Sequence, residues 1–582
     1  MPTPSVSNSH PGRSLRSLVP LLSALALLLC GCAENPDDAA DALPDRCQLV
    51  FTTPALQQVW DGGDQLLAEI RDVSPELTEE LLLYMEEVKS LLTHRLDPAE
   101  LTTLQEIHDT GLDVTRTTAL GLKLGLSLRG PTASFLLSLP LHDPLRFQGF
   151  IDELLGEDRR EAEELGEHHG VQLRRSSSGL FAAHHRGVLL LGDDLELVTA
   201  GLDALLAREG RFFDDADHRR LHLAQADAHL GAYLDVKRFR ALLEPLAQGF
   251  GLPETAVEQL LLTRGVSLGL RIQPRGLRLR LCSVHDGRLD IAADTAPAVS
   301  DDALFYADLP LQGSHLGSLL GWAGERLTHG ATREQLAGLE EFGNSLIDGL
   351  RFNVYDGGGF PTGYFAVKLA DPAGAREFYE AAVLPLMRLK LSEYLTEFRI
   401  LRTETVDGLV DIFDIAALER LHLQPAVAFI GDHFVFTAMR ERLPQIRRLL
   451  HSGNTTDDLP ADYRLAGEKL TTERVLSFCS IDKTARLVDA TPLLRIPAAA
   501  RELAKVYELL AVGMDNGGEL TEVEVVLCRR DHQPAASLMT SEVVTPWPWW
   551  LWLSIGGVLV LTGLFFAIRA LVRSRRRKNQ RN

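Results

Sequence analysis

Cysteine is scarce in this sequence. Six occur among 582 residues, and two of them, Cys30 and Cys32, lie close to the N-terminus. The other four form neither a CxxC pair nor a spacing typical of zinc sites. An oxidising compartment permits disulfides without requiring them. Cys479 and Cys528 lie on predicted strands of one domain and form the more plausible pair, with reduced core cysteines as the alternative.

Positive charge is also in short supply. The chain has 59 Lys and Arg against 80 Asp and Glu, a net charge of −21. Nine of the basic residues stand at the two ends, so the middle of the chain is more acidic than the total indicates. Because an acidic body repels phosphates, nucleic acid is excluded as a partner.

Motifs for catalysis, metals and phosphates are missing. The GxSxG match at 265–269 runs into an alternating strand, and the SxxK match at 480–483 has no accompanying SDN or KTG. His218 and His222 have a helical i, i+4 spacing but lack the Glu of HExxH. The adjacent pairs 168–169 and 184–185 are interpreted as solvated surface. The sequence therefore predicts a non-enzyme with no catalytic residue, metal ligand or cofactor.

Long apolar runs are limited to the two ends. Residues 549–568 carry no charge over the length of a membrane-spanning helix. Tryptophans lead into this run, and basic residues follow it in the tail 569–582: Arg569, Arg573, Arg575, Arg576, Arg577, Lys578 and Arg581. Basic flanks remain in the cytoplasm. The pattern predicts one transmembrane helix, anchored by this cytoplasmic tail and preceded by a linker at 534–548.

The N-terminal run predicts export. Arg13 and Arg16 precede a short apolar segment, as in a signal peptide over residues 1–32. Leu29-Cys30-Gly31-Cys32 resembles a bacterial lipobox, which makes Cys32 the candidate lipidation site; cleavage elsewhere and a signal anchor are the alternatives. An acidic spacer follows at 33–46. These features predict a bacterial inner-membrane, single-pass lipoprotein with its ectodomain in the periplasm.

The middle of the chain contains an internal duplication. Residues 135–144 and 363–372 each read as a strand that ends in Asp-Pro, where Asp caps a helix and Pro occupies its first turn. Hairpins followed by helices recur at 180–191 and 426–437. Such repeats predict two copies of one structural unit.

Four segments repeat a strand, a cap and a helix, and hairpins of alternating apolar residues follow them. The clearest hairpin pairs 266–272 with 277–281. The predicted fold class is therefore α+β: two tandem homologous domains, 47–290 and 300–533, each an antiparallel sheet with helices on one face, plus the transmembrane helix.

This combination resembles a family of bacterial envelope proteins of unknown function. The resemblance rests on the strand–Asp-Pro–helix elements, the Gly-Asp hairpin at 431–432, the signal or lipoprotein-type N-terminus and the C-terminal membrane segment. The first copy departs from it, with His185-Arg186-Gly187 in place of Gly-Asp. The resemblance implies a duplicated α+β ectodomain and supplies no catalytic residues.

The sequence thus predicts a membrane-tethered periplasmic binding or scaffold protein. Its partners would be the membrane and either a protein or an apolar ligand. Two alternatives stay open: a lipid or lipoprotein carrier with an apolar cavity, and a periplasmic hydrolase with dispersed catalytic residues. A fold model discriminates between them. A cavity favours the carrier, a cleft with perturbed titratable groups favours the enzyme, and a filled core with an exposed apolar patch favours a protein partner.

Overall fold

The computed structural model describes most of the region between residues 38 and 529. The described ranges are 38–75, 104–127, 130–147, 149, 163–176, 179–240, 262–273, 276–286, 297–312, 317, 332–359, 361–394, 398–405, 408–419, 422–454, 458–490 and 504–529. The chain forms two compact units, 1–58 with 95–220 and 59–94 with 221–582. The strand ladders given below are antiparallel.

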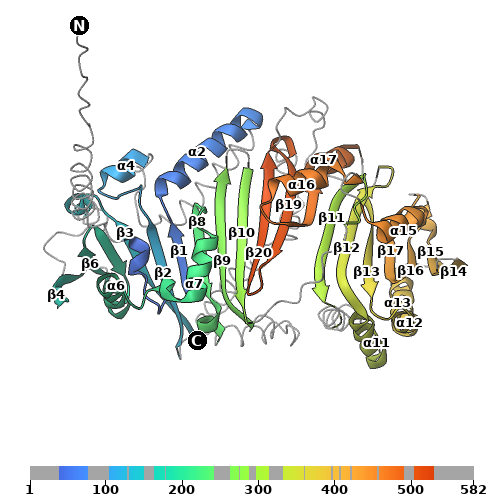
Figure 1. Ribbon diagram of the computed structural model, residues 1–582, viewed down its shortest axis with the longest axis horizontal. Coiled ribbons are helices and arrows are strands. Elements are labelled where there is room, and N and C mark those ends of the chain that lie inside the picture. Colours follow the sequence, from blue (N-terminus) through green and yellow to red (C-terminus); the bar gives the residue numbers. More distant parts are fainter. Residues whose placement is uncertain are drawn as a thin grey trace, which may run out of the picture. The chain divides into compact units, whose positions relative to one another are not determined.

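The first unit is built on one ladder of strands (Figure 1). Its spatial order is β4–β5–β6–β7–β3–β2–β1. The bounds are β1 Leu49–Thr53, β2 Thr118–Ser127, β3 Gly130–Pro140, β4 Glu163–His168, β5 Val171–Arg175, β6 Phe181–His185 and β7 Val188–Gly192. Helix α6, Leu195–Ala207, starts at the N-cap Asp194, packs on β6 and β7, and buries the leucines at 197, 202 and 205.

The remaining helices of this unit are short. They are η1 Ala39–Ala42 and α4 Leu104–Asp109, with a 3₁₀ turn at Phe212–Asp214. Two further helices begin in this unit and end in the other, α2 Leu56–Val73 and α7 Ala216–Ala224.

The second unit contains a longer ladder, in the order β8–β9–β10–β20–β19–β18–β11–β12–β13–β17–β16–β15–β14. The first six strands in this order are β8 Leu230–Asp235, β9 Thr263–Gln273, β10 Gly276–His285, β20 Leu520–Arg529, β19 Tyr507–Asn516 and β18 Arg474–Ser480. The others are β11 Ala303–Gln312, β12 Leu346–Asp356, β13 Pro361–Leu369, β17 His433–Thr437, β16 Ala426–Ile430, β15 Gly408–Asp414 and β14 Arg399–Thr405.

The described helices of the second unit lie on both faces of this ladder, with α11 to α13 on one side and α15 on the other. They are α11 Arg333–Asn344, α12 Pro372–Phe378, the π-helical turn Tyr379–Val383, α13 Leu384–Tyr394, α14 Ala416–Glu419, α15 Leu443–Ser452, α16 Ala461–Lys469 and α17 Ile481–Ala490. A 3₁₀ turn at Arg440–Arg442 precedes α15.

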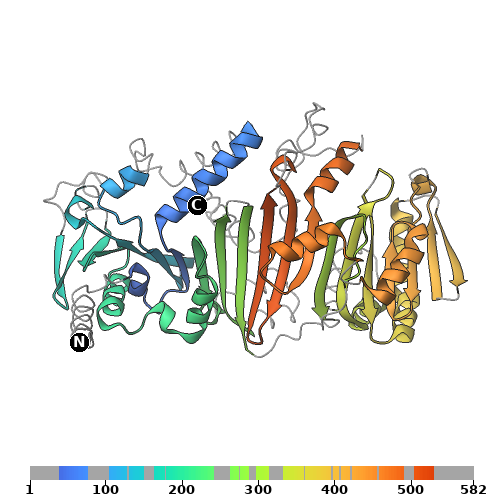
Figure 2. The same ribbon diagram turned by 45° about the horizontal axis from the view of Figure 1, so that its top comes forward.

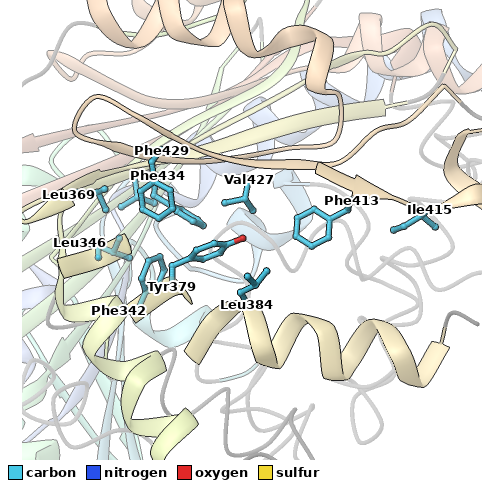
Figure 3. Packing of buried hydrophobic residues seen from close by; sticks show 12 residues of the cluster. Phe342, Leu346, Leu369, Tyr379, Leu384, Phe413, Ile415, Val427, Phe429 and Phe434 are labelled. Atoms are coloured by element: carbon cyan, nitrogen blue, oxygen red, sulfur yellow. The ribbon is translucent and has the colours of Figure 1, made fainter. Parts of the chain in front are cut away.

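An aromatic core holds α11 to α13 against the sheet (Figure 3). Tyr379 lies among Phe342, Phe429 and Phe434, and its ring meets that of Phe429 edge-on at 5.5 Å. The Phe429 and Phe434 rings are also 5.5 Å apart and edge-on. Such aromatic pairs add stability beyond the apolar area that they bury. This part of the fold is a filled core.

Several local predictions are confirmed. The carboxylate of Asp371 accepts the backbone N–H of Ala373, and Pro372 occupies the first turn of α12. In the corresponding Asp-Pro of the first unit, Asp143 accepts the N–H of Arg146. The hairpins predicted at 180–191, 266–281 and 426–437 are β6–β7, β9–β10 and β16–β17.

The predicted fold class is wrong, because the strands do not divide into two tandem sheets. β10 comes from the first predicted domain and β20 from the second, yet they pair from Gly276↔Cys528 to Val284↔Leu520. An edge strand offers unpaired N–H and C=O groups. Here the backbone groups of β10 and β20 pair with each other, so neither strand is an edge. The strand order of β1–β7 does recur in β11–β17.

The membrane predictions are also corrected. Among the described residues, no helix combines the length and the apolar character needed to cross a bilayer. The longest, α2, has 18 residues and carries Asp61, Asp64, Glu69, Arg71 and Asp72. On this finding we do not retain the single transmembrane helix, the inner-membrane location with a cytoplasmic C-terminus, or the membrane as an integral partner. The segments 1–32, 534–548, 549–568 and 569–582 lie outside the described residues.

Candidate functional site

The sheet formed by β8, β9, β10, β20 and β19 has one face that is almost entirely aliphatic. Cross-strand register places Ile272, Leu277, Leu527 and Leu510 in one row, and Leu270, Leu279, Val525 and Val512 in the next. Because cross-strand partners point to the same side of a sheet, these rows form a continuous surface. We call it the aliphatic face; its members are Leu230, Leu234, Val266, Leu268, Leu270, Ile272, Leu277, Leu279, Leu281, Leu510, Val512, Val523, Val525 and Leu527.

The aliphatic face is not closed over as a core would be. None of these members is fully buried, and Leu230 and Leu281 are 40% and 41% exposed; Met514, which pairs with Val523 at the edge of the same face, is 8% exposed. Leucine, valine and isoleucine are the residues most often found fully inside proteins. A contiguous exposed apolar surface usually marks a place where something binds.

The opposite face of the same strands is more deeply buried. It is polar mainly on β9 and β10, whereas on β19 and β20 it carries Leu509, Ala511, Val526 and Cys528 of an apolar core cluster. Glu524 and Cys282 are fully inaccessible, and Ser267 is 1% exposed. The amide of Gln225 donates to the hydroxyl of Ser267 at 3.1 Å and to the carbonyl of Arg280 at 3.0 Å. On β9 and β10 the usual alternation of a half-buried sheet is thus inverted, with polar residues inside and aliphatic ones partly outside.

Ion pairs engage the charged side chains on the polar face and at its edge, where Arg271 and Asp227 are partly exposed. Arg280 Nε lies 2.8 Å from a carboxylate oxygen of Glu522, and its Nη1 lies 3.0 Å from Asp227. Arg271 Nη1 lies 2.5 Å from the other oxygen of Asp227. Buried charges are tolerated only with such partners. The polar face is therefore a structural layer with its groups engaged.

Two carboxyl pKa values on this layer move in opposite directions. Burial raises the pKa of Glu522, and the nearby Arg280 offsets this only in part. Burial also acts to raise the pKa of Asp227, but Arg280 and Arg271 outweigh it and hold that pKa below its ordinary value. The pattern fits a charge network that stabilises the sheet.

Two helices cross one end of the aliphatic face. Leu66 and Ile70 of α2 pack with Ile481 of α17 against Leu527 and the buried Tyr507. Farther along α2, a side chain at Gly62 would meet the Cβ of Ile272 at 3.3 Å, so the helix backbone comes close to β9 there. Figure 2 shows α2 above the strand ends from which the rest of the face extends. The two helices therefore cover one end of the aliphatic face.

An apolar hollow lies beside α15. Its cavity measures about 480 Å³ and is lined by Val410, Ala428, Phe429, Ile430, Leu443 and Pro444, with the basic side chains of Arg447, Arg448 and His451. The floor consists of strands β15 and β16. This α15 groove differs from the aliphatic face in having positive charge at its rim.

The predicted disulfide between Cys479 and Cys528 is not formed in the described structure. Cys479 shares a register row with Leu510 and hence with Leu527, whereas Cys528 pairs with Leu509. Neighbouring residues of a strand point to opposite faces, so the two sulfur atoms lie on opposite sides of the sheet. Burial raises the pKa of the Cys479 thiol.

Other residues considered from the sequence take separate positions. His218 stacks on Phe212 at 4.1 Å, while His222 meets the hydroxyl of Tyr233 at 3.1 Å, so the two do not form a metal site. Ser267 of the GxSxG match lies inside β9, and Ser480 of the SxxK match ends β18. Cys32 and the basic tail residues from Arg569 to Arg581 lie outside the described residues.

The strands of the aliphatic face were predicted from the sequence, but the partial exposure of their apolar side chains was not. The alternation in 266–281 shows that one face is apolar, and the ordinary interpretation is that this face is buried. One signal was available in the sequence. Charged residues (Arg278, Arg280 and Glu524) alternate with the aliphatic ones on these strands, which would have indicated a polar face opposite the aliphatic one. The pairing of β10 with β20 joins the two halves of the surface.

Comparisons with known proteins do not identify a family. No family model matches the chain, and no curated protein matches it. Solved structures of TP0453 in crystal forms IV and III show weak similarity. The form IV match has 11% identity, a TM-score of 0.23, and covers 44% of this chain and 83% of that one. The form III match has 10% identity, a TM-score of 0.22, and covers 43% and 80%.

Proposed function

We propose that the protein is a non-enzymatic binding protein whose aliphatic face holds the acyl chain of a fatty acid or lipid. The observation that carries the proposal is the inverted alternation on β9 and β10: polar and charged side chains lie on the inner face there, and the aliphatic face is partly open. Burying the face against another apolar surface would be favourable, at about 0.8 kcal/mol for each methylene removed from water.

The composition of the face favours an acyl chain over a protein partner. Protein interfaces are enriched in aromatic residues and arginine, which provide rigid anchors and hydrogen bonds. The aliphatic face consists of leucine, isoleucine and valine, with Ala232 and Met514 at the ends of one register row, and it has no aromatic side chain. Such a surface offers dispersion contacts without directional preference, which suits a flexible hydrocarbon.

The dimensions also fit. The face spans four strand spacings from β8 to β19, roughly 19 Å at about 4.8 Å each. One acyl chain covers half of a hydrocarbon core that is about 30 Å thick, or roughly 15 Å. A single extended chain would therefore lie on the face without projecting far beyond it.

The experiment measures binding of a long-chain fluorescent fatty acid to the purified full-length protein. Leu281→Gln introduces an amide in the most exposed part of β10. The double variant Val523→Thr with Val525→Thr nearly keeps the side-chain shapes and replaces one methyl group of each side chain on β20 with a hydroxyl. Each variant should weaken binding by about tenfold, equivalent to about 1.4 kcal/mol.

The matched control is Leu401→Gln. Leu401 is a strand leucine in the same unit, 47% exposed on β14, and does not belong to the aliphatic face. Its variant should bind as the wild type does. The proposal would be overturned if the wild type failed to bind the probe, or if Leu401→Gln weakened binding as much as Leu281→Gln.

The α15 groove provides the competing location. Arg447→Gln, Arg448→Gln and His451→Gln remove the cationic groups that would contact a carboxylate head group there. If these three variants lose the fatty acid while Leu281→Gln retains it, the ligand lies in the α15 groove and the assignment to the aliphatic face is wrong.

A further inference from the structure

The histidine pair at the β4–β5 turn lies against a carboxylate from α6. His168 Nε2 is 2.6 Å from Asp203 Oδ1, and His169 Nε2 is 3.3 Å from the same oxygen. One ligand atom from each residue lies within 4.8 Å of the other two. The two imidazole rings meet edge-on, with their centroids 4.4 Å apart.

We propose that His168, His169 and Asp203 form a binding site for a divalent transition-metal ion. Two imidazoles and one carboxylate are the ligands that Zn²⁺ takes from proteins, with bonds of about 2.0–2.2 Å. Such bonds require ligand atoms roughly 3–3.5 Å apart. The 3.3 Å between His169 Nε2 and Asp203 Oδ1 is in this range, and His168 Nε2, at 2.6 Å from the same oxygen, would move apart slightly to share an ion with it. The donor set is softer than the all-oxygen sets that Mg²⁺ and Ca²⁺ prefer.

The backbone fixes two of the ligands in place. β4 and β5 are joined by a two-residue turn, in which His169 and Gly170 have φ values of 49° and 78°. Tight hairpins usually place Asn or Asp at the first of these positions. The histidine there brings a second imidazole beside His168, which ends β4.

The third ligand stands on a rigid element. Asp203 lies on α6 between Leu202 and Ala204. The side chains of these two neighbours are buried in the core, while that of Asp203 is 49% exposed. Because the helix is anchored by its core residues, the carboxylate is held toward the turn. The site has three protein ligands, which leaves coordination positions for water or a small ligand.

The repeated strand order gives an internal comparison. β14 and β15 occupy the places in the second unit that β4 and β5 occupy in the first. The connection there reads Val406-Asp407-Gly408 and contains no histidine. The fold therefore does not require imidazoles at this turn, and the cluster is specific to the first unit.

The test is a calorimetric titration of untagged, chelator-treated full-length protein with Zn²⁺, paralleled by visible absorption of bound Co²⁺. The wild type should bind one ion at this site, detected as one saturable equivalent that His169→Ala removes. His169→Ala and Asp203→Asn should each weaken that binding by at least about tenfold. Both ligands are accessible, with 66% and 49% of the side chain exposed, so these variants should fold.

His184→Ala is the matched control, because His184 also belongs to an adjacent histidine pair and is exposed on the neighbouring strand β6. It should bind Zn²⁺ as the wild type does. The inference is overturned if the wild type shows no saturable binding. It is equally overturned if Zn²⁺ binding is unchanged in His169→Ala and Asp203→Asn while circular dichroism shows both to be folded.

Discussion

Arg278 and Glu524 face each other across the pairing of β10 with β20, with Nε and Oε1 3.0 Å apart and the Glu524 side chain wholly inaccessible. The other oxygen of Glu524 accepts the backbone N–H of Thr471 at 2.6 Å and its hydroxyl at 2.8 Å. The carboxylate thus ties together two strands that are more than 200 positions apart in sequence.

We expect Glu524→Ala to destabilise the protein by about 3–5 kcal/mol, because it leaves the Arg278 guanidinium buried without its partner. The measurement is urea denaturation followed by circular dichroism. Glu196→Ala is the control: its pair with Arg46 is exposed on both sides, and its loss should cost under about 1 kcal/mol. Equal effects of the two variants would contradict a structural role for Glu524.

Gly276 begins β10 with a φ of 143°, and a Cβ at this position would overlap the carbonyl oxygen of Leu527 on β20. Gly276→Ala should therefore disturb the strand pairing and destabilise the protein by more than about 2 kcal/mol. Gly518 has a φ of 90° with no atom near its missing Cβ. Gly518→Ala tests the effect of a positive φ without a steric clash, so it should destabilise the protein less than Gly276→Ala does. A larger loss of stability in Gly518→Ala would argue against a close approach at Gly276.

Cys282 is fully buried on the polar face. Burial, aided by Glu522, raises the pKa of its thiol to about 12, although Arg280 and a hydrogen bond from Ser267 act in the other direction. The thiolate is the reactive form, so iodoacetamide at mildly alkaline pH should label Cys282 only after denaturant is added. Peptide mass spectrometry provides the measurement. Rapid labelling of Cys282 in the native protein would show that this layer opens.

His285 is buried at the end of β10, where its ring contacts the hydroxyl of Ser283 at 2.7 Å and that of Thr263 at 3.3 Å. Burial, together with Arg264, lowers its pKa in the folded protein. The unfolded chain therefore binds a proton first as the pH falls through about 6.5, and the free energy of unfolding decreases below that value.

Replacing His285 with glutamine should reduce this loss of stability between pH values of about 7.5 and about 5.5, as measured by urea denaturation. His451→Gln changes an exposed histidine on α15 and should leave the pH dependence as in the wild type. A His285→Gln variant with the full wild-type pH dependence would show that this residue does not contribute.

The local elements could be predicted from sequence because their causes are local. An Asp-Pro pair caps a helix wherever its backbone N–H groups are otherwise unpaired, and strict alternation specifies a strand. The hairpin β9–β10 and the helix start at Asp371 follow from these rules alone. The recurrence of such signals also predicted repeated structural elements along the chain.

The candidate sites depend on contacts between distant segments. His168 and Asp203 are 35 positions apart, and a histidine pair followed at that distance by an aspartate resembles no motif. The aliphatic face needs β10 beside β20, a choice of edge partner that no local pattern specifies. The sequence predicted separate sheets because each half contains enough strands to form one.

By itself, the sequence determined where strands, turns and helix caps begin and end, because backbone sterics and short-range hydrogen bonds decide these within a few residues. Only the tertiary structure decided which face of each strand is covered, because burial depends on elements brought from elsewhere in the chain. Alternation distinguishes the two faces of a strand; packing determined that Glu524 lies inside and Leu281 remains partly open.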